Sequence, residues 1–263
     1  MSKKIYLDKY YTPSDLAEYC VNKTNEIIGI NNITQWVEPS AGNGSFLPFL
    51  KDNYIAYDLE PEHENIIKQD YLSLNLPYLK GRCIIGNPPF GRSNNLIVSF
   101  YKKAINQCDY IAFILPISQH ENNIRLYDFD MVYSEKLKEV KYSGVTLKCC
   151  LNIYKRPLSK LNKKPNYKLK DVNIFEHHSK RNPLKFDSNT HDFRMCAWGA
   201  KMGAEVIEQK YALEYCVKVN NNKYKKEIVD LLKNADWKNN ISTPNLCKWQ
   251  IYKYLKEQIP ELE

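Results

Sequence analysis

Apolar and polar positions in the first 155 residues follow two periods. Leu16 and Ile27 lie on one face at helical spacing, which predicts a helix over 15–28 that Ser14 can cap. A second helix is expected over 94–106 for the same reason. Four short apolar runs have the length of buried strands: 33–37, 54–57, 82–86 and 110–115. Helices that alternate with such strands are typical of a doubly wound α/β sheet.

The pattern changes towards residue 157. Two apolar runs, 137–142 and 145–154, are separated only by a Ser-Gly pair, which predicts an antiparallel hairpin that closes the sheet. Pro157 marks the expected boundary of the first domain. We therefore expect a domain at 1–156.

The remaining residues, 157–263, are less regular. A strand is expected over 211–219, a helix over 223–235, and a last helix that Thr243 and Pro244 open. This region should form a smaller unit of mixed α+β structure.

Composition places the chain among ordinary globular proteins, with 43% apolar and 26% charged residues in 263. It lacks an apolar run long enough for a membrane helix and an N-terminal signal peptide, so we expect a cytoplasmic protein with no membrane partner. The eight cysteines include no C-x-x-C pair. We expect them to be reduced and mostly buried thiols.

Positive charge is concentrated in the C-terminal part. The whole chain carries a net charge of +8, and residues 155–185 alone hold ten basic and two acidic side chains. Such a segment could follow a phosphate backbone, with Lys160, Lys163, Lys164 and Lys168 as the expected contacts. The competing explanation is an AT-rich codon usage that enriches lysine without any role in binding.

Small residues follow the first expected strand in the run WVEPSAGNGSF, residues 36–46. Glycine, alanine and serine let a ligand approach the backbone closely at such a turn. Asp58 ends the next strand, where a carboxylate can accept hydrogen bonds from both hydroxyls of a ribose. The turn has neither the G-x-G-x-x-G spacing nor a phosphate-loop ending, which favours a nucleoside cofactor without a pyrophosphate.

The third expected strand runs into Asn87-Pro88-Pro89-Phe90. The two prolines fix the backbone and remove two donors, so that the Asn87 side-chain oxygen and the Pro88 carbonyl remain as acceptors. Two acceptors can hold the amino group of a flat ring while Phe90 stacks on that ring. The loop thus predicts a site for a planar amine.

These motifs resemble the S-adenosylmethionine-dependent amino-methyltransferases, and among them the DNA adenine-N6 methyltransferases of bacterial modification systems. The resemblance covers roughly residues 8–156 and implies a Rossmann-like methyltransferase sheet. The motif order is similar to the gamma arrangement, in which the C-terminal part reads the target sequence. The chain has NPPF where NPPY is more familiar, which keeps the stacking ring and removes a hydroxyl.

The resemblance also implies individual roles. The glycine turn would hold the methionine part of the cofactor, Asp58 the ribose and Asp70 the adenine, while Tyr11 belongs to a segment that closes over the methionine end. The cofactor-binding residues expected in this way are Tyr11, Thr12, Pro13, Glu38, Pro39, Ser40, Ala41, Gly42, Asn43, Gly44, Phe46, Asp58, Leu59, Asp70, Tyr71 and Asn87. The expected catalytic residues are Asn87, Pro88, Pro89 and Phe90, and Phe90 also binds the substrate.

The favoured function is therefore methylation of the adenine N6 amino group in double-stranded DNA, without a metal and with a companion restriction endonuclease as an optional partner. An RNA adenine methyltransferase would share every catalytic residue. A protein glutamine methyltransferase and a cofactor-binding module without catalysis are further alternatives, which the basic C-terminal region and the intact Asn87 disfavour. His120 is expected at the surface, and Arg194, Trp198, Gly199 and Lys201 could read DNA.

Overall fold

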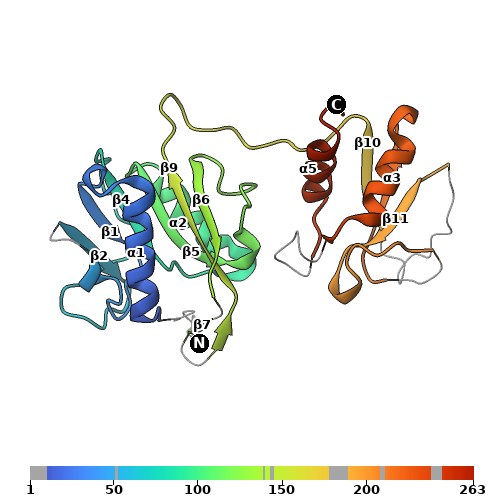
Figure 1. The fold of residues 1–263 in the computed structure, drawn as a ribbon. Helices are drawn as coiled ribbons and strands as arrows, with labels where there is room; N and C mark the ends of the chain where they lie inside the picture. The colour runs from blue at the N-terminus through green and yellow to red at the C-terminus, as the bar shows by residue number, and fades with distance from the viewer. Residues whose placement is uncertain are drawn as a thin grey trace. The chain divides into compact units, whose positions relative to one another are not determined.

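The computed structural model describes residues 11–50, 53–138, 140–142, 145–177, 189–207, 211–237 and 245–263 (Figure 1). The chain divides into two compact units, Met1–Pro165 and Asn166–Glu263. Within the described ranges, no helix is long and apolar enough to cross a membrane.

A single sheet organises the first unit. Seven of its described strands are ordered β3-β2-β1-β4-β5-β9-β6. Their bounds are β1 Gln35–Glu38, β2 Tyr54–Asp58, β3 Ile67–Lys68, β4 Arg82–Gly86, β5 Tyr110–Pro116, β6 Asp130–Lys136 and β9 Cys149–Lys155. The strands from β3 to β5 are parallel, and β9 runs antiparallel to both β5 and β6. This Rossmann-like order confirms the predicted fold class.

The closing hairpin is longer than the sequence predicted. The arm that pairs with β9 is β6, which begins at Asp130, seven residues before the predicted start. The tip forms a separate two-stranded sheet of β7 (Val140–Tyr142) and β8 (Val145–Leu147). Strand β6 escaped prediction because it is a half-exposed edge strand with polar residues at both faces, so that its apolar alternation is weak.

Both faces of the sheet are covered, and β5 shows how the sequence achieves this. Ile111, Phe113 and Leu115 alternate with Ala112 and Ile114, and the two sets belong to separate apolar cores. Helix α1 (Ser14–Ile28) packs in the core of one face and helix α2 (Asn95–Ala104) in the core of the other (Figure 1). A strand buried on both faces reads as one continuous apolar run.

The helix starts differ from prediction at both helices. Pro13 is the N-cap of α1, and Ser14 is the first helical residue and makes no capping hydrogen bond, so the predicted cap is wrong. Proline suits this position because its fixed φ angle leads into the helix. Helix α2 begins after Ser93 and Asn94, whose φ angles of 54° and 60° are left-handed and exclude them from it.

The second unit contains a smaller antiparallel sheet. Its described strands are ordered β10-β12-β11, with the bounds β10 Val172–His177, β11 Phe193–Cys196 and β12 Glu214–Val219. Helices α3 (Lys225–Asn234) and α5 (Lys248–Gln258) share one apolar core with this sheet. The predicted mixed α+β structure is confirmed. Thr243 and Pro244, predicted to open the last helix, lie outside the described residues.

Candidate active site at the carboxyl edge of the sheet

Three neighbouring parallel strands bring the predicted motifs to one edge. Strand β1 ends at Glu38, β2 at Asp58 and β4 just before Asn87. The order β2-β1-β4 makes these ends adjacent. The approach is close, because a Cβ added to Gly86 would lie 3.4 Å from Cγ of Glu38. Polar groups that are 20 to 50 residues apart in sequence therefore meet at a single site.

The glycine turn after β1 is fastened to Asp58. Gly42 adopts a left-handed φ of 53°, and its N–H donates to Oδ2 of Asp58 at 2.8 Å. The Glu60 N–H donates to the other carboxylate oxygen, Oδ1, at 2.8 Å. Each carboxylate oxygen has two acceptor positions, so Asp58 can organise the turn and still accept hydrogen bonds from a ligand.

Glu38, one of the predicted cofactor-binding residues, is a buried acidic group at this edge. Its side chain is only 2% exposed, and its Oε2 atom has no hydrogen-bond partner in the described structure. Burial, followed by the negative charge of Asp58, raises the pKa of Glu38 well above its usual value. A buried carboxylate of this kind is a ready acceptor for a cation.

A small cavity of about 30 Å³ surrounds these groups. Its lining residues are Tyr11, Thr12, Glu38, Ser40, Ala41, Gly42, Asn43, Ser45, Phe46 and Asn87. Tyr11 helps to close it, because its ring would come within 3.4 Å of a Cβ on Gly42 and its hydroxyl donates to Glu62. Tyr11 and the glycine turn thus lie on facing sides of the cavity.

Asn87 is held from two directions. Its Nδ2 donates to Oγ1 of Thr12 at 3.3 Å, and its backbone carbonyl accepts a hydrogen bond from Oγ of Ser40 at 3.4 Å. Pro88 is buried, and Phe90 is half-buried and packs against both apolar cores of the first unit. The loop that carries the predicted catalytic residues is thus anchored to the segment before α1 and to the glycine turn.

The residues after this loop are also fixed. Arg125 donates from Nη1 to the Ser93 carbonyl and from Nη2 to Oδ1 of Asn95, both at 2.7 Å. These contacts span the left-handed pair that precedes α2. Neither Arg125, Ser45 nor Glu62 was among the predicted site residues. Ser45 had a signal in its place within the turn, whereas Arg125 and Glu62 reach the site from elsewhere in the fold.

Seven of the predicted cofactor residues lie outside the cavity lining. Tyr71 is 1% exposed, donates its hydroxyl proton to Gln107 and stacks on Phe100, so its side chain is part of the core. Asp70 accepts a hydrogen bond from the Leu72 N–H. Leu59 is exposed. Four other predicted residues adjoin the lining residues in sequence or form a hydrogen bond with one of them: Pro13, Pro39, Gly44 and Asp58.

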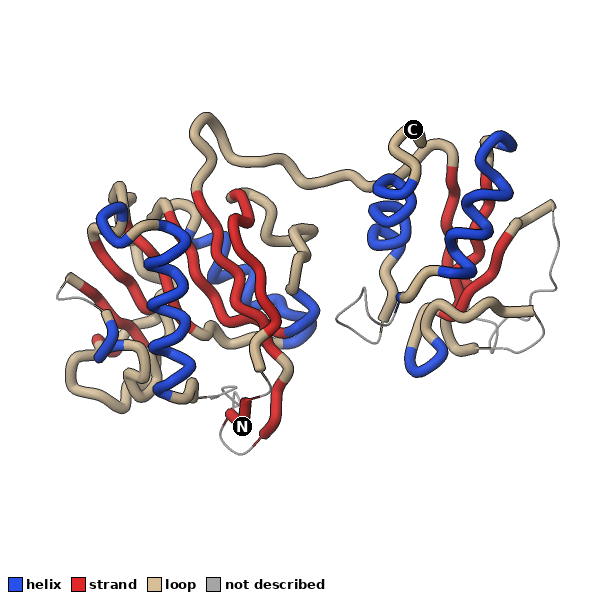
Figure 2. Tube along the Cα trace, viewed as in Figure 1, coloured by secondary structure: helices blue, strands red, loops and turns tan. Residues whose placement is uncertain are grey.

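The basic segment divides into two parts. Lys160, Lys163, Lys164 and Lys168, hereafter the linker lysines, are all exposed and form no ion pair among the described residues. They lie in a stretch that Figure 2 shows as loop. Arg156, by comparison, donates to the Ile105 and Cys108 carbonyls and pairs with Asp109 at 3.1 Å, so it belongs to the fold of the first unit. Residues 178–185 lie outside the described ranges.

The residues suggested to read DNA differ in their exposure to solvent. Arg194 is 3% exposed and pairs with the buried Glu214 at 3.4 Å, so it cannot reach a base and that suggestion is wrong. Trp198 is 57% exposed and stands beside an exposed turn that contains Gly199 and Lys201. The partner of Arg194, Glu214, lies on the neighbouring strand β12, and no local pattern around residue 194 indicates that pairing.

His120 is half-buried, not a fully exposed surface residue, and burial lowers its pKa. All eight cysteines are free thiols, and seven of them are buried as predicted, whereas Cys247 is exposed.

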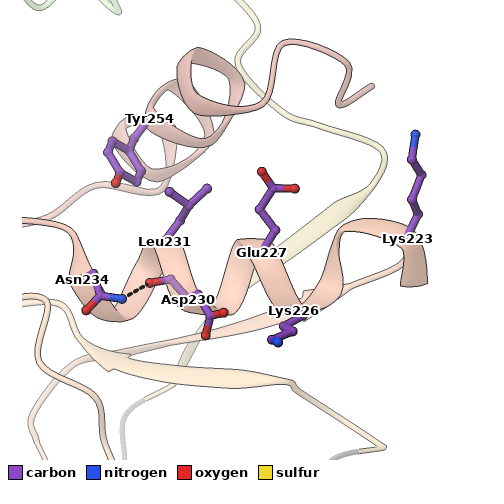
Figure 3. Close-up of a pocket in the computed structure, with 7 residues that line it drawn as sticks. All are labelled: Lys223, Lys226, Glu227, Asp230, Leu231, Asn234 and Tyr254. Atoms are coloured by element: carbon purple, nitrogen blue, oxygen red, sulfur yellow. Dashed lines mark hydrogen bonds between the residues drawn. The ribbon is translucent and has the colours of Figure 1, made fainter.

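A second hollow, of about 510 Å³, lies between α3 and α5 (Figure 3). Leu231 and Tyr254 supply its apolar part, and Lys226, Glu227 and Asp230 are among its charged groups. None of the predicted site residues lines it. Charges of both signs surround it, so it has no evident selectivity for an anionic ligand.

Comparison with known proteins finds similarity to solved structures and no similarity in sequence to a family or a curated protein. No protein-family model matches the chain, and no curated protein matches its sequence. A presumed RNA methyltransferase from Pyrococcus horikoshii is 17% identical, with 59% of this chain and 90% of that chain covered and a TM-score of 0.49. The M protein of the type I restriction enzyme EcoKI is also 17% identical, with 61% and 47% covered and a TM-score of 0.44.

A type I restriction-modification methyltransferase subunit from Streptococcus thermophilus is 13% identical, with 86% of this chain and 53% of that chain covered and a TM-score of 0.43. Because these TM-scores are below 0.5, the fold class rests on the strand order of the sheet itself.

Proposed function

We propose that the chain transfers a methyl group from S-adenosylmethionine to the N6 amino group of an adenine in double-stranded DNA. The observation that carries the proposal is the meeting of two motifs at one sheet edge. The glycine turn fastened to Asp58 adjoins the Asn87-Pro88-Pro89-Phe90 loop, and Ser40 of the turn bonds the backbone of Asn87. In this proposal the first unit is catalytic and the second reads the target.

The site fits the cofactor by charge. S-adenosylmethionine carries an ammonium and a sulfonium group, and Glu38 offers a buried carboxylate oxygen that has no partner in the described structure. A cation beside this oxygen would satisfy it and lower the cost of its ionisation. Asp58 can accept hydrogen bonds from the ribose hydroxyls, since its oxygens already lie at the strand end.

The chemistry requires little more than positioning. The cofactor supplies an electrophilic methyl group on a positively charged sulfur. Oδ1 of Asn87 and the Pro88 carbonyl accept the two N–H bonds of the target amine, and Phe90 stacks on the base. The nitrogen lone pair then forms the N–C bond as the C–S bond breaks, and the amine proton is lost to solvent.

DNA contact would come from the C-terminal half. The exposed linker lysines suit contacts with phosphates, and the exposed Trp198 and Lys201 are the remaining candidates for base contacts. The mark would be sequence-specific, as in restriction-modification or epigenetic marking. A companion endonuclease is compatible with this function and not required by it.

The proposal is tested by transfer of a labelled methyl group from S-adenosylmethionine to duplex DNA, structured RNA and a protein mixture, each offered separately. Hydrolysis of the DNA to nucleosides should yield N6-methyladenine, and the Asn87→Ala variant should yield none. Transfer to RNA alone or to protein alone would replace the DNA assignment by the corresponding alternative. Failure of the chain to bind S-adenosylmethionine in calorimetry would refute the proposal altogether.

A further inference from the structure

The segment that follows β9 is tied to the first unit at two points. Arg156 fixes its start, because its backbone N–H donates to the Asp109 carbonyl at 2.8 Å and its side chain pairs with the Asp109 carboxylate. Further along the chain, Asn162 bonds to the first unit again. Residues 157–162, hereafter the anchored loop, are therefore closed on the first unit at both ends.

Asn162 closes this loop with two hydrogen bonds. Its backbone N–H donates to the Asp128 carbonyl at 2.9 Å, and its side-chain Nδ2 donates to Oδ1 of Asp130 at 2.8 Å. Asp128 is 7% exposed and pairs through its carboxylate with Lys102 of α2, and Asp130 is the first residue of β6. Both acceptors thus belong to the ordered elements of the first unit.

The anchored loop carries positive charge on its outer side. Lys160 lies within the loop and Lys163 directly follows Asn162, and both side chains are exposed. Among the described residues neither of them forms an ion pair, whereas Lys102 is paired with Asp128. Both lysines belong to the first unit, which carries the candidate active site, while Lys168 belongs to the second unit.

A cation on an anchored backbone binds a polyanion at a lower entropic cost than a cation on a free tether. Binding through a free tether must order the backbone as well as the side chain, and this ordering weakens the complex. Phosphates of a nucleic-acid backbone need no shaped pocket, so two exposed lysines can neutralise them from an open surface.

We propose that Asn162 is a positioning residue: it fastens the anchored loop so that Lys160 and Lys163 form a phosphate contact of the first unit itself. This inference rests on the proposed function, because it takes DNA as the substrate. It gives the two lysines a fixed place on the catalytic unit, which the charge of the basic segment alone does not provide.

Limited proteolysis of the full chain without DNA tests the anchor directly. Trypsin cleaves extended segments, so cleavage after Lys160 requires the anchored loop to open. Asn162→Ala should accelerate this cleavage by about threefold to tenfold, the effect of one lost hydrogen bond. Ser159→Ala, an exposed position in the same loop, should cleave at the wild-type rate. Equal rates in Asn162→Ala and the wild type would overturn the inference.

DNA binding tests what the anchor is for. With a fluorescent duplex at fixed salt, Asn162→Ala should raise the Kd for DNA by about threefold to tenfold, because binding must then order the released loop. In methylation assays the KM for DNA should rise with it, while kcat and the Kd for S-adenosylmethionine stay unchanged. Ser159→Ala should change none of these values. An unchanged affinity of Asn162→Ala for DNA would overturn the inference.

A double-mutant cycle separates positioning from any other effect of Asn162. The variant with Lys160→Gln and Lys163→Gln should bind DNA more weakly, with a salt slope reduced by about 0.9 for each phosphate that is no longer neutralised. Adding Asn162→Ala to this variant should weaken binding by less than twofold, because the two cations that the loop positions are gone. Equal weakening in both backgrounds would overturn the inference. Failure of the wild-type chain to bind or methylate DNA would refute the proposed function as well, whereas the proteolysis result tests the anchor by itself.

Discussion

Substitution of Glu38 by glutamine should stabilise the chain and at the same time disable it. The native carboxyl group is buried beside Asp58, which raises its pKa well above the usual value, while the unfolded chain titrates near about 4.3. Between these two values the folded state retains a proton that the unfolded state has lost. This contribution to stability is fully present below about pH 4.3 and is lost as pH rises through the native pKa.

The slope of this decline follows from linkage. One proton that is bound only in the folded state changes the free energy of unfolding by about 1.4 kcal/mol for each pH unit. Glutamine has no proton to lose, so the stability of Glu38→Gln relative to wild type should rise with pH above about 4.3 and level off once pH passes the native pKa of Glu38. For a unit of this size the gap in Tm should widen by about 2 to 4 °C for each kcal/mol.

Thermal unfolding of both proteins at several pH values measures this gap, with Glu64→Gln as a matched control. Glu64 is exposed, so Glu64→Gln controls for the loss of a carboxyl group outside the site. Calorimetry should show that Glu38→Gln binds S-adenosylmethionine more weakly by about 1.5 to 3 kcal/mol, because a charged hydrogen bond is removed. A Tm gap that stays constant from pH 5 to pH 7 would refute the account of Glu38 as a buried, proton-retaining carboxyl group.

Three other sets of substitutions test the roles of the motifs and of the linker lysines. Asp58→Ala should weaken S-adenosylmethionine binding by about 1.5 to 3 kcal/mol in calorimetry, whereas Asn87→Ala should leave binding nearly unchanged and abolish turnover; an equal drop in affinity in both variants would contradict this division. Phe90→Tyr and Phe90→Trp should stay active, while Phe90→Leu should lose most activity in methylation assays, since stacking contributes about 1 to 3 kcal/mol. Changing the linker lysines to glutamine should reduce the salt slope of DNA binding by about 0.9 for each phosphate that is no longer neutralised, and an unchanged slope would favour codon usage as their origin.

The parts of the fold that could be predicted are those in which local pattern and burial agree. Strand β5 is buried on both faces, so its unbroken apolar run was a sufficient signal. Strand β6 lies at the edge of the sheet and is half-exposed, and its mixed pattern offered no comparable signal. The N-cap of α1 is Pro13 and not the predicted Ser14, a difference of one residue that only the backbone geometry decides.

In the candidate site, too, contacts between residues distant in sequence could not be predicted. The turn after β1 and the loop after β4 were predictable because each is a short continuous motif at a strand end. Two hydrogen bonds join residues far apart in sequence: one between Asn87 and Thr12, and one from Arg125 to the carbonyl of Ser93. No spacing rule within the chain predicts such pairs, since they follow from how the strands are ordered and how the loops pack.

The number of basic side chains predicts DNA binding poorly where those side chains form ion pairs inside the fold. Arg156 falls within the basic segment 155–185, and Arg194 was suggested to read DNA, yet each neutralises a buried or half-buried carboxylate inside its own unit. A guanidinium is suited to this because its fork of donors satisfies several acceptors at once. The linker lysines contribute the same unit of charge and remain exposed. In the proposed function, attraction to DNA would therefore come from exposed cations such as the linker lysines, whereas Arg156 and Arg194 act on the stability of the two units.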